Sequence, residues 1–260
     1  ERRPCPSPSA ECDAWEIEFD SFDSFRISGW MIAPKGMAAR EIRRGVVVSH
    51  GYGGRGGPDG GVAGPPAAAI FPCARGLGRS RRDGIGDNGH AHVLHGIESR
   101  ETYIHRGCAA DVWAAASALL ELYPSAAARL DYIGGSFGGG IGAIALPWDR
   151  RFARAYLDVP SFGNHSLRLK LPCVGSGQST QRLYQSQPEV LEVLKYFDSA
   201  TAARFIRIPT LVSPALADTA VPPPGQFAVY NCLAGPKRLF VRKAAHCGPE
   251  AMAEDSARLG

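Results

Sequence analysis

The chain has 260 residues, 45% of them hydrophobic and 21% charged, which is typical of a globular protein with a substantial core. Its formal net charge of +4 is mild, and its basic residues are spread along the chain rather than gathered in one patch. No apolar run approaches the roughly 18 residues that a membrane-spanning helix needs. We therefore expect neither a nucleic-acid partner nor a membrane.

The seven cysteines are scattered, odd in number and without a C-x-x-C pair. In a chain of this length, scattered thiols are typical of a reducing compartment rather than of a disulfide framework. We therefore predict a cytoplasmic protein. A bond between Cys5 and Cys12 is the alternative for those two residues.

The predicted elements begin with strands. Three prolines within the first ten residues predict an N-terminal arm over residues 1–14. Alternating polar and apolar residues predict strands at 15–19 and 26–32, whereas "GVVVSH" (45–50) has the continuous β-branched run of a strand buried on both faces. A weaker strand candidate covers 68–74.

Residues 75–102 are predicted to form a long loop, and apolar residues at helical spacing predict a helix over 104–123 that Pro124 ends. The remaining predicted elements are strands at 129–135, 154–159, 208–216 and 237–244, helices at 138–146, 188–197 and 224–233, and a terminal helix. This alternation predicts an α/β fold with a mainly parallel sheet and helices on both faces. We expect one domain over residues 15–260, with a cap-like insertion at about 160–205.

The segment "LDYIGGSFGGGIGAIAL" (130–146) contains six glycines within nine residues. One interpretation is a phosphate cradle, because Gly138 begins a G-x-G-x-x-A pattern and Asp158 follows it by 20 residues. The predicted strand, however, already ends at Gly134, and Pro147 ends the following helix early. Both details weaken the case for a nucleotide site.

The alternative is a nucleophile elbow, since "GGSFG" (134–138) fits G-x-S-x-G between a strand and a helix. In such an elbow the serine adopts strained backbone angles and needs small neighbours. The H-G-x-G-G turn in "SHGYGG" (49–54) is a candidate for one oxyanion donor, and the N–H of Phe137 is a candidate for the other. This pattern predicts Ser136 as a catalytic nucleophile.

A serine hydroxyl needs a base to remove its proton, and the base needs an orienting carboxylate. In an α/β-hydrolase both follow the serine along the chain, first the acid and then the histidine. We predict Asp218, after the strand 208–216, as the acid and His246 as the base. The alternatives are Asp158 or Asp198 for the acid and His165 for the base.

Six stretches carry a resemblance to one family: "HGYGGRGGP" (50–58), "ARGLG" (74–78), "GIESRETYIHRG" (96–107), "GGSFGGG" (134–140), "ALADTAVPPPGQFAVYN" (215–231) and "AHCGPEA" (245–251). On these stretches, in this order, the chain resembles the acetyl xylan esterase / cephalosporin-C deacetylase family of α/β-hydrolases. It departs from the family pattern at Leu77, where the family commonly has Gln, and at Cys247, where it commonly has Glu.

The resemblance implies an α/β-hydrolase fold, a Ser136, Asp218 and His246 triad, and oxyanion donors at the amides of Tyr52 and Phe137. It also implies removal of small acyl groups, chiefly acetyl, from sugar hydroxyls and cephalosporin C inside the cell, and assembly into a homo-oligomer. The family works without metal. The histidine-rich stretch "GHAHVLH" (89–95) lacks the carboxylate of a metal-binding loop, so we expect no metal and no cofactor.

Together these features predict a serine esterase that hydrolyses short-acyl esters of carbohydrates or related small molecules through an acyl-enzyme. A prolyl-oligopeptidase-type peptidase and a broad carboxylesterase share the same triad order and are the alternatives among enzymes. Outside enzymes, the alternative is a non-catalytic binding domain on a hydrolase scaffold. Phe162, in the predicted insertion, either lines the acyl pocket or packs within the insertion.

Overall fold

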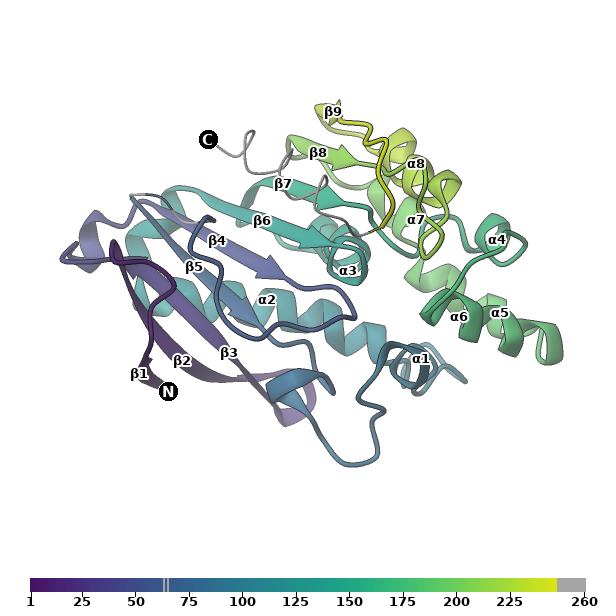
Figure 1. Cartoon of the computed structure of the whole chain (residues 1–260), viewed down its shortest axis with the longest axis horizontal. Helices are drawn as coiled ribbons and strands as arrows, with labels where there is room; N and C mark the ends of the chain where they lie inside the picture. The colour runs from purple at the N-terminus through teal and green to yellow at the C-terminus, as the bar shows by residue number, and fades with distance from the viewer. Residues whose placement is uncertain (63, 65, 247–260) are drawn as a thin grey trace.

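A nine-stranded sheet forms the centre of the computed structural model, which describes residues 1–62, 64 and 66–246 (Figure 1). The strands, in chain order, are β1 (Arg2–Cys5), β2 (Cys12–Ser21), β3 (Phe25–Pro34), β4 (Arg44–Ser49), β5 (Ala67–Pro72), β6 (Leu130–Gly135), β7 (Phe152–Asp158), β8 (Thr210–Ser213) and β9 (Lys237–Leu239). Their order across the sheet is β1-β2-β3-β5-β4-β6-β7-β8-β9. The pairs from β5 to β9 are parallel and those from β1 to β5 are antiparallel, so the sheet is mainly parallel as predicted.

Eight α-helices belong to the described residues: α1 (Gly89–His92), α2 (Ile104–Leu122), α3 (Phe137–Ala145), α4 (His165–Arg168), α5 (Ser176–Ser186), α6 (Val190–Leu194), α7 (Ser199–Ala203) and α8 (Pro223–Cys232). Helices α2 and α3 pack on the central strands, and α7 packs between α3 and α8. No helix in the described part of the chain is long and apolar enough to cross a membrane.

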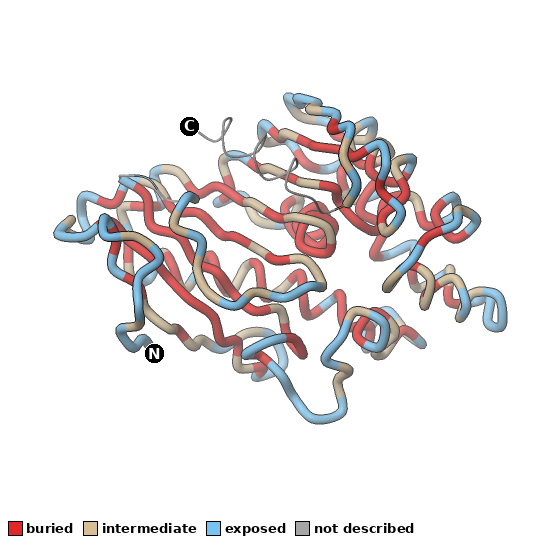
Figure 2. Tube along the Cα trace, in the orientation of Figure 1, coloured by how far each residue is buried: buried red, intermediate tan, exposed pale blue. Residues whose placement is uncertain are grey.

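The central strands are buried along most of their length (Figure 2). In β4, Val47 joins the large apolar core under the helices, while Val46 and Val48 join a second core on the opposite face. Successive side chains of a strand point to opposite faces, so a run of three valines fills both. The structure thus confirms the prediction that the run "GVVV" forms a strand buried on both faces.

Several elements differ from the sequence-based prediction, among them the short helix α1, which lies within the predicted loop 75–102. Within the predicted N-terminal arm, Arg2–Cys5 forms strand β1, paired antiparallel with β2. Helix α5 was not predicted, because its sequence "SGQSTQRLYQS" has few apolar residues at helical spacing. Strand β9 is three residues long, shorter than the predicted 237–244. The predicted terminal helix lies outside the described residues.

The predicted insertion at about 160–205 contains the four short helices α4–α7. Helices α4, α5 and α6 lie at the end of the molecule toward which the central parallel strands point (Figure 1). Helix α5 contacts α1, and α4 contacts α8. In parallel α/β sheets this carboxyl end of the strands is where ligands bind, so the insertion borders the region in which a site is expected.

Candidate active site

Ser136 occupies the sharp turn between β6 and α3. Its backbone angles are φ +54° and ψ −116°, a conformation that non-glycine residues rarely adopt and that costs about 1–3 kcal/mol. Its N–H donates to the carbonyl of Asp158 (2.9 Å), and its carbonyl accepts from the N–H groups of Gly140 and Ser161 (3.0 Å each). Three backbone hydrogen bonds therefore hold the serine in the strained conformation expected of a nucleophile elbow.

The glycines after Ser136 allow the backbone of α3 to lie directly on its neighbours. A Cβ atom added at Gly138 would lie 2.8 Å from the carbonyl oxygen of His50, and one added at Gly140 would lie 2.4 Å from that of Ser161. One added at Gly142 would lie 2.1 Å from the ring of Tyr132. Protein atoms thus occupy the space beside these glycines, which favours the elbow over the phosphate cradle.

Asp218 and His246 are brought together after β8 and near the end of the described chain. The Nδ1–H of His246 donates to Asp218 Oδ2 at 2.7 Å. Asp218 is buried, and its Oδ1 also accepts from the N–H groups of Ala220 (2.9 Å) and Val221 (2.8 Å). Because Asp218 fixes the proton on Nδ1, the Nε2 of a neutral His246 is left as the basic nitrogen.

The hydroxyl of Ser136 makes no hydrogen bond to an imidazole within residues 1–62, 64 and 66–246. Hydrogen bonds of catalytic groups are often long in the absence of substrate and shorten in the substrate complex. The turn after β4 does reach the serine: a Cβ added at Gly51 would lie 3.8 Å from Ser136 Oγ. Cys247, beside the predicted base, lies outside the described residues.

The alternative acids and base have other contacts. Asp158 forms an ion pair with Arg242 (3.0 Å). Asp198 caps α7 by accepting from the N–H of Thr201, and it also accepts from the backbone N–H of His165 (2.6 Å). Among the three candidate aspartates, the contact with the His246 imidazole is made by Asp218.

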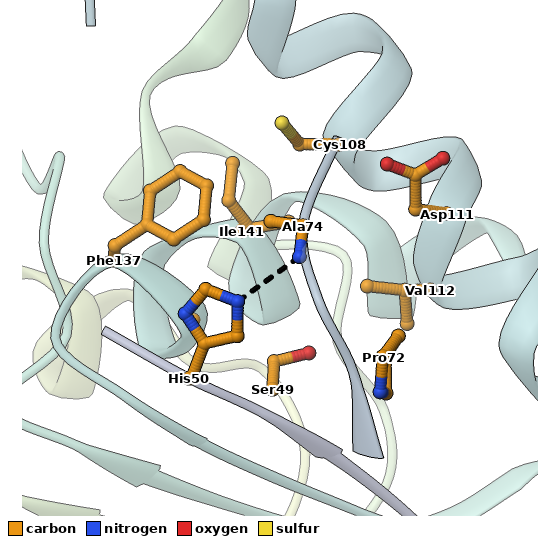
Figure 3. A pocket seen from close by; sticks show the side chains of 10 residues that line it. Ser49, His50, Pro72, Ala74, Cys108, Asp111, Val112, Phe137 and Ile141 are labelled. Carbon is orange, nitrogen blue, oxygen red and sulfur yellow. Dashed lines mark hydrogen bonds between the residues drawn. The ribbon is translucent and has the colours of Figure 1, made fainter. Parts of the chain in front are cut away.

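His50 holds the predicted oxyanion turn in place. Its Nδ1–H donates to the carbonyl of Gly51 (2.6 Å), and its Nε2 accepts from the N–H of Ala74, two residues after β5 (3.0 Å; Figure 3). Burial lowers the pKa of His50, which keeps the ring neutral and Nε2 able to accept. In the described chain the N–H of Tyr52 has no acceptor, and that of Phe137 lies in the first turn of α3, where helical amides lack an intrahelical acceptor.

A small cavity of about 20 Å³ lies behind this turn (Figure 3). Its lining residues come from the ends of β4 and β5, the loops that follow them, α2 and α3: Ser49, His50, Pro72, Ala74, Cys108, Asp111, Val112, Phe137, Gly138 and Ile141. A space of this size holds about one water molecule and cannot take an acyl group. The cavity is therefore a small gap in the packing behind the turn and not a substrate pocket.

Tyr52 is tied to the histidine-rich loop by a chain of hydrogen bonds. His105 Nε2 lies 3.4 Å from the Tyr52 hydroxyl, which lies 3.3 Å from His92 Nδ1. His92 Nε2–H in turn donates to the carbonyl of Arg75 (2.8 Å). Burial lowers the pKa of His92 to about 4 and that of His105 well below its usual value, so both rings are neutral near pH 7.

The loop that contains His92 is anchored through Arg75, which forms a bidentate ion pair with Asp111 of α2 (2.7 and 3.0 Å). Leu77, at the position where the resembling family commonly has Gln, is buried in the large apolar core. The residues that the structure describes contain no group of three His, Cys, Asp or Glu side chains able to hold a metal ion.

Gln226 of α8 is a site residue that sequence reasoning missed. It is fully buried, and its Nε2–H₂ donates to Asp218 Oδ2 (2.9 Å) and to the carbonyl of Val221 (2.5 Å). Its Oε1 accepts from the N–H of Ala215 (2.9 Å). The sequence offered one sign of this role, which is the polar amide of Gln226 beside the apolar residues of "PGQFAVYN". Gln226 therefore positions the carboxylate that contacts His246.

We expect Gln226→Leu to lower the free energy of unfolding by about 1–3 kcal/mol, because the buried N–H of Ala215 and the carboxylate of Asp218 each lose a partner. kcat for ester hydrolysis should fall more than KM changes, since the orientation of Asp218 matters for His246 rather than for substrate binding. Urea unfolding and initial-rate kinetics measure both. Asn231→Leu, at an exposed position of the same helix, is the matched control, and an equal effect of the two changes would contradict the role of Gln226.

Residues 2–256 match the acetyl xylan esterase (AXE1) family. The fold is similar to an acetyl xylan esterase from Paenibacillus sp. R4 (TM-score 0.85, 24% identity, covering 99% of this chain and 86% of that one) and to acetyl xylan esterase 1 from Thermoanaerobacterium sp. JW/SL YS485 (TM-score 0.85, 19% identity, 100% and 86%).

A more distant similarity is to an acylaminoacyl peptidase from Pyrococcus horikoshii (TM-score 0.71, 18% identity), of which the chain covers 40% while 99% of this chain is matched. At these identities the solved structures establish the fold, whereas the family match, which spans nearly the whole chain, establishes the family. The predicted resemblance and the predicted α/β-hydrolase fold are both confirmed. The chain belongs to the acetyl xylan esterase family and is a carboxylic ester hydrolase.

Proposed function

We propose that the protein hydrolyses short-acyl esters, chiefly acetyl esters of carbohydrates, through an acyl-enzyme on Ser136. The observation that carries this proposal is the strained serine of the elbow, next to the turn at Gly51, combined with the hydrogen bond between His246 and the buried carboxylate of Asp218. The acetyl xylan esterase family match and the two acetyl xylan esterase structures support the choice of an acetylated carbohydrate.

In the proposed mechanism, His246 Nε2 takes the proton of Ser136 Oγ while the hydroxyl oxygen attacks the ester carbonyl carbon. The carboxylate of Asp218 keeps the other ring proton on Nδ1 and stabilises the imidazolium that forms. The amides of Tyr52 and Phe137 donate to the oxyanion, and each such donor is worth about 3 kcal/mol of transition-state stabilisation. His246 then gives its proton to the departing sugar oxygen, and water repeats the sequence to release the acid.

A panel of substrates tests the reaction. We expect kcat/KM for 4-nitrophenyl acetate to exceed that for the octanoate by about tenfold or more, as a pocket fitted to a short acyl group would give. The butyrate should fall between them, and acetylated xylo-oligosaccharides should release acetate. Flat rates across the series would favour a broad carboxylesterase, and cleavage of an aminoacyl anilide would favour a peptidase.

A covalent probe tests the alternative that the protein is a non-catalytic binding domain. A fluorophosphonate probe reacts with activated serines, so we expect one adduct, at Ser136, when the labelled protein is digested and its peptides are analysed. A protein that neither hydrolyses any ester nor takes up the probe would be a binding domain.

We further propose that the protein works in the cytoplasm. All six cysteines of the described residues are free: Cys5, Cys12, Cys73, Cys108, Cys173 and Cys232. Cys5 pairs in register with Ala14 across β1 and β2, so the alternative of a Cys5–Cys12 bond is not realised. Fractionation of the source cells should recover the esterase activity with cytoplasmic markers, and recovery outside the cells would contradict this location.

A further inference from the structure

The candidate nucleophile and its two partners are carried by different parts of the sheet. Ser136 follows β6, whereas Asp218 follows β8 and His246 follows β9. Strand β7 lies between β6 and β8 (Figure 1). In the described chain the Ser136 hydroxyl makes no hydrogen bond to an imidazole, so the approach of His246 to Ser136 depends on how these parts of the sheet are held together.

Asp218 and His246 belong to one unit, because the chain after β9 runs beside the chain after β8. The N–H of Arg242 donates to the carbonyl of Pro214 (2.8 Å), and the carbonyl of Arg242 accepts from the N–H of Leu216 (2.9 Å). The hydrogen bond between His246 and Asp218 joins the same two segments farther along. We call residues 214–218 and 242–246 the acid–base unit, since these bonds hold the acid and the base together.

Arg242 links the acid–base unit to the strand beside the elbow. Its side chain is 1% exposed, and its Nη2 forms an ion pair with Oδ1 of Asp158, the last residue of β7 (3.0 Å). To reach Asp158, the guanidinium passes the end of β8, which lies between β7 and β9 in the sheet. The carbonyl of Asp158 accepts from the N–H of Ser136 (2.9 Å). Arg242 and Asp158 therefore connect the acid–base unit to the nucleophile.

The carboxylate of Asp158 is also held from β8. The hydroxyl of Tyr156 lies 3.5 Å from Asp158 Oδ1 and 3.1 Å from the Oγ of Ser213, which pairs in register with Asp158. A buried ion pair adds little net stability, because desolvation of the two charges offsets much of their attraction. Its geometry is specific, because the guanidinium is planar and its N–H groups point in fixed directions. The ion pair is thus better suited to fixing two segments relative to each other than to stabilising the fold.

We propose that Arg242 and Asp158 are positioning residues for catalysis. Their ion pair holds the acid–base unit at the distance from Ser136 at which His246 Nε2 takes the proton of the hydroxyl. This inference rests on the proposed function and deepens it, because it assigns two residues that act on the reaction without touching the ester. Asp158, which the sequence left open as an alternative acid, acts through Arg242.

Two variants separate positioning from stability. Arg242→Met leaves the Asp158 carboxylate without its ion-pair partner, so both the urea midpoint and kcat should fall. The double variant Arg242→Met/Asp158→Asn removes both charges. We expect its urea midpoint to return toward the wild-type value, while its kcat for 4-nitrophenyl acetate stays about 10- to 100-fold below wild type, as misplaced catalytic groups give. KM should change little, because neither residue contacts the substrate. A kcat that recovers together with the urea midpoint would make the pair purely structural and overturn the proposal.

Lys243→Met is the matched control. Lys243 is exposed and follows Arg242 directly, so this change removes an equal charge from the same segment and keeps the ion pair. We expect wild-type values of kcat, KM and urea midpoint. A loss of kcat equal to that of the double variant would attribute the effect to the net charge of the segment and contradict the role of the ion pair.

Crystal structures of the wild type and the double variant separate this inference from the proposed function, because they need no turnover. In the double variant we expect His246 Nε2 to lie farther from Ser136 Oγ by about 1 Å or more, with the hydrogen bond between His246 and Asp218 kept. This displacement in a protein that hydrolyses no ester would overturn the esterase function and keep the positioning role. Hydrolysis of 4-nitrophenyl acetate by the wild type, with His246 unmoved in the double variant, would do the reverse.

Discussion

Ser136→Ala is expected to lower kcat for 4-nitrophenyl acetate by at least about four orders of magnitude, as removal of the nucleophile does in serine hydrolases with a triad. Alanine lacks the oxygen that attacks the carbonyl, and the remaining oxyanion donors and His246 can support only slow attack by water. KM should change little, since the hydroxyl contributes little to ground-state binding. Initial rates with purified protein over a range of substrate concentrations measure both constants.

The matched control is Ser161→Ala. Ser161 donates its backbone N–H to the carbonyl of Ser136 (3.0 Å), and alanine keeps that bond while removing a neighbouring hydroxyl. We expect this variant to retain most of the wild-type kcat, and both variants should unfold at a similar urea concentration. Near-wild-type turnover by Ser136→Ala would rule out the acyl-enzyme mechanism.

The second large effect is on stability at acid pH. His92 is neutral in the folded protein because burial lowers its pKa to about 4, whereas in the unfolded chain the pKa is about 6.5. Between these values the unfolded state binds the proton more readily, so the free energy of unfolding falls as the pH drops from about 6.5 to about 4. For His92 alone the loss is on the order of 3 kcal/mol, and buried His165, with a pKa also lowered to about 4, adds to it.

Urea unfolding at several pH values between 4 and 7 measures this loss. In His92→Gln, where the residue cannot take up a proton, the decline toward acid pH should be shallower. His90, an exposed residue whose Nδ1 meets Ser179 Oγ at 3.0 Å, provides the control: His90→Gln should keep the wild-type slope. A wild-type stability that is flat between pH 4 and 6.5 would contradict the neutral, buried state of these rings.

How far the site could be predicted differs from residue to residue. The elbow was predictable because G-x-S-x-G between a strand and a helix depends on short-range sterics. The choice among Asp158, Asp198 and Asp218 was not settled by spacing, since each follows or flanks a regular element. Only the packed loop after β8 brings the carboxylate of Asp218 to within 2.7 Å of His246 Nδ1.

Residues that act through other side chains were the least predictable. Gln226 lies within an apolar helix, and its hydrogen bond to Asp218 depends on how α8 packs beside the end of β8. His105 Nε2 lies 3.4 Å from the hydroxyl of Tyr52, a contact that no motif around His105 indicates. No local sequence pattern indicates such contacts. The contact of His105 with Tyr52 joins distant parts of the chain, and that of Gln226 with Asp218 depends on how α8 is oriented relative to β8.

The sequence by itself determined the α/β class, the order of most strands and helices, the serine elbow and the family. These features depend on the period of apolar residues and on glycine at tight turns, which act over a few neighbouring positions. Only the tertiary structure decided that β1 extends the sheet and that Gln226 holds Asp218. Those outcomes depend on which distant segments pack together and exclude water, and burial is what turns an ordinary amide side chain into a group that must have a partner.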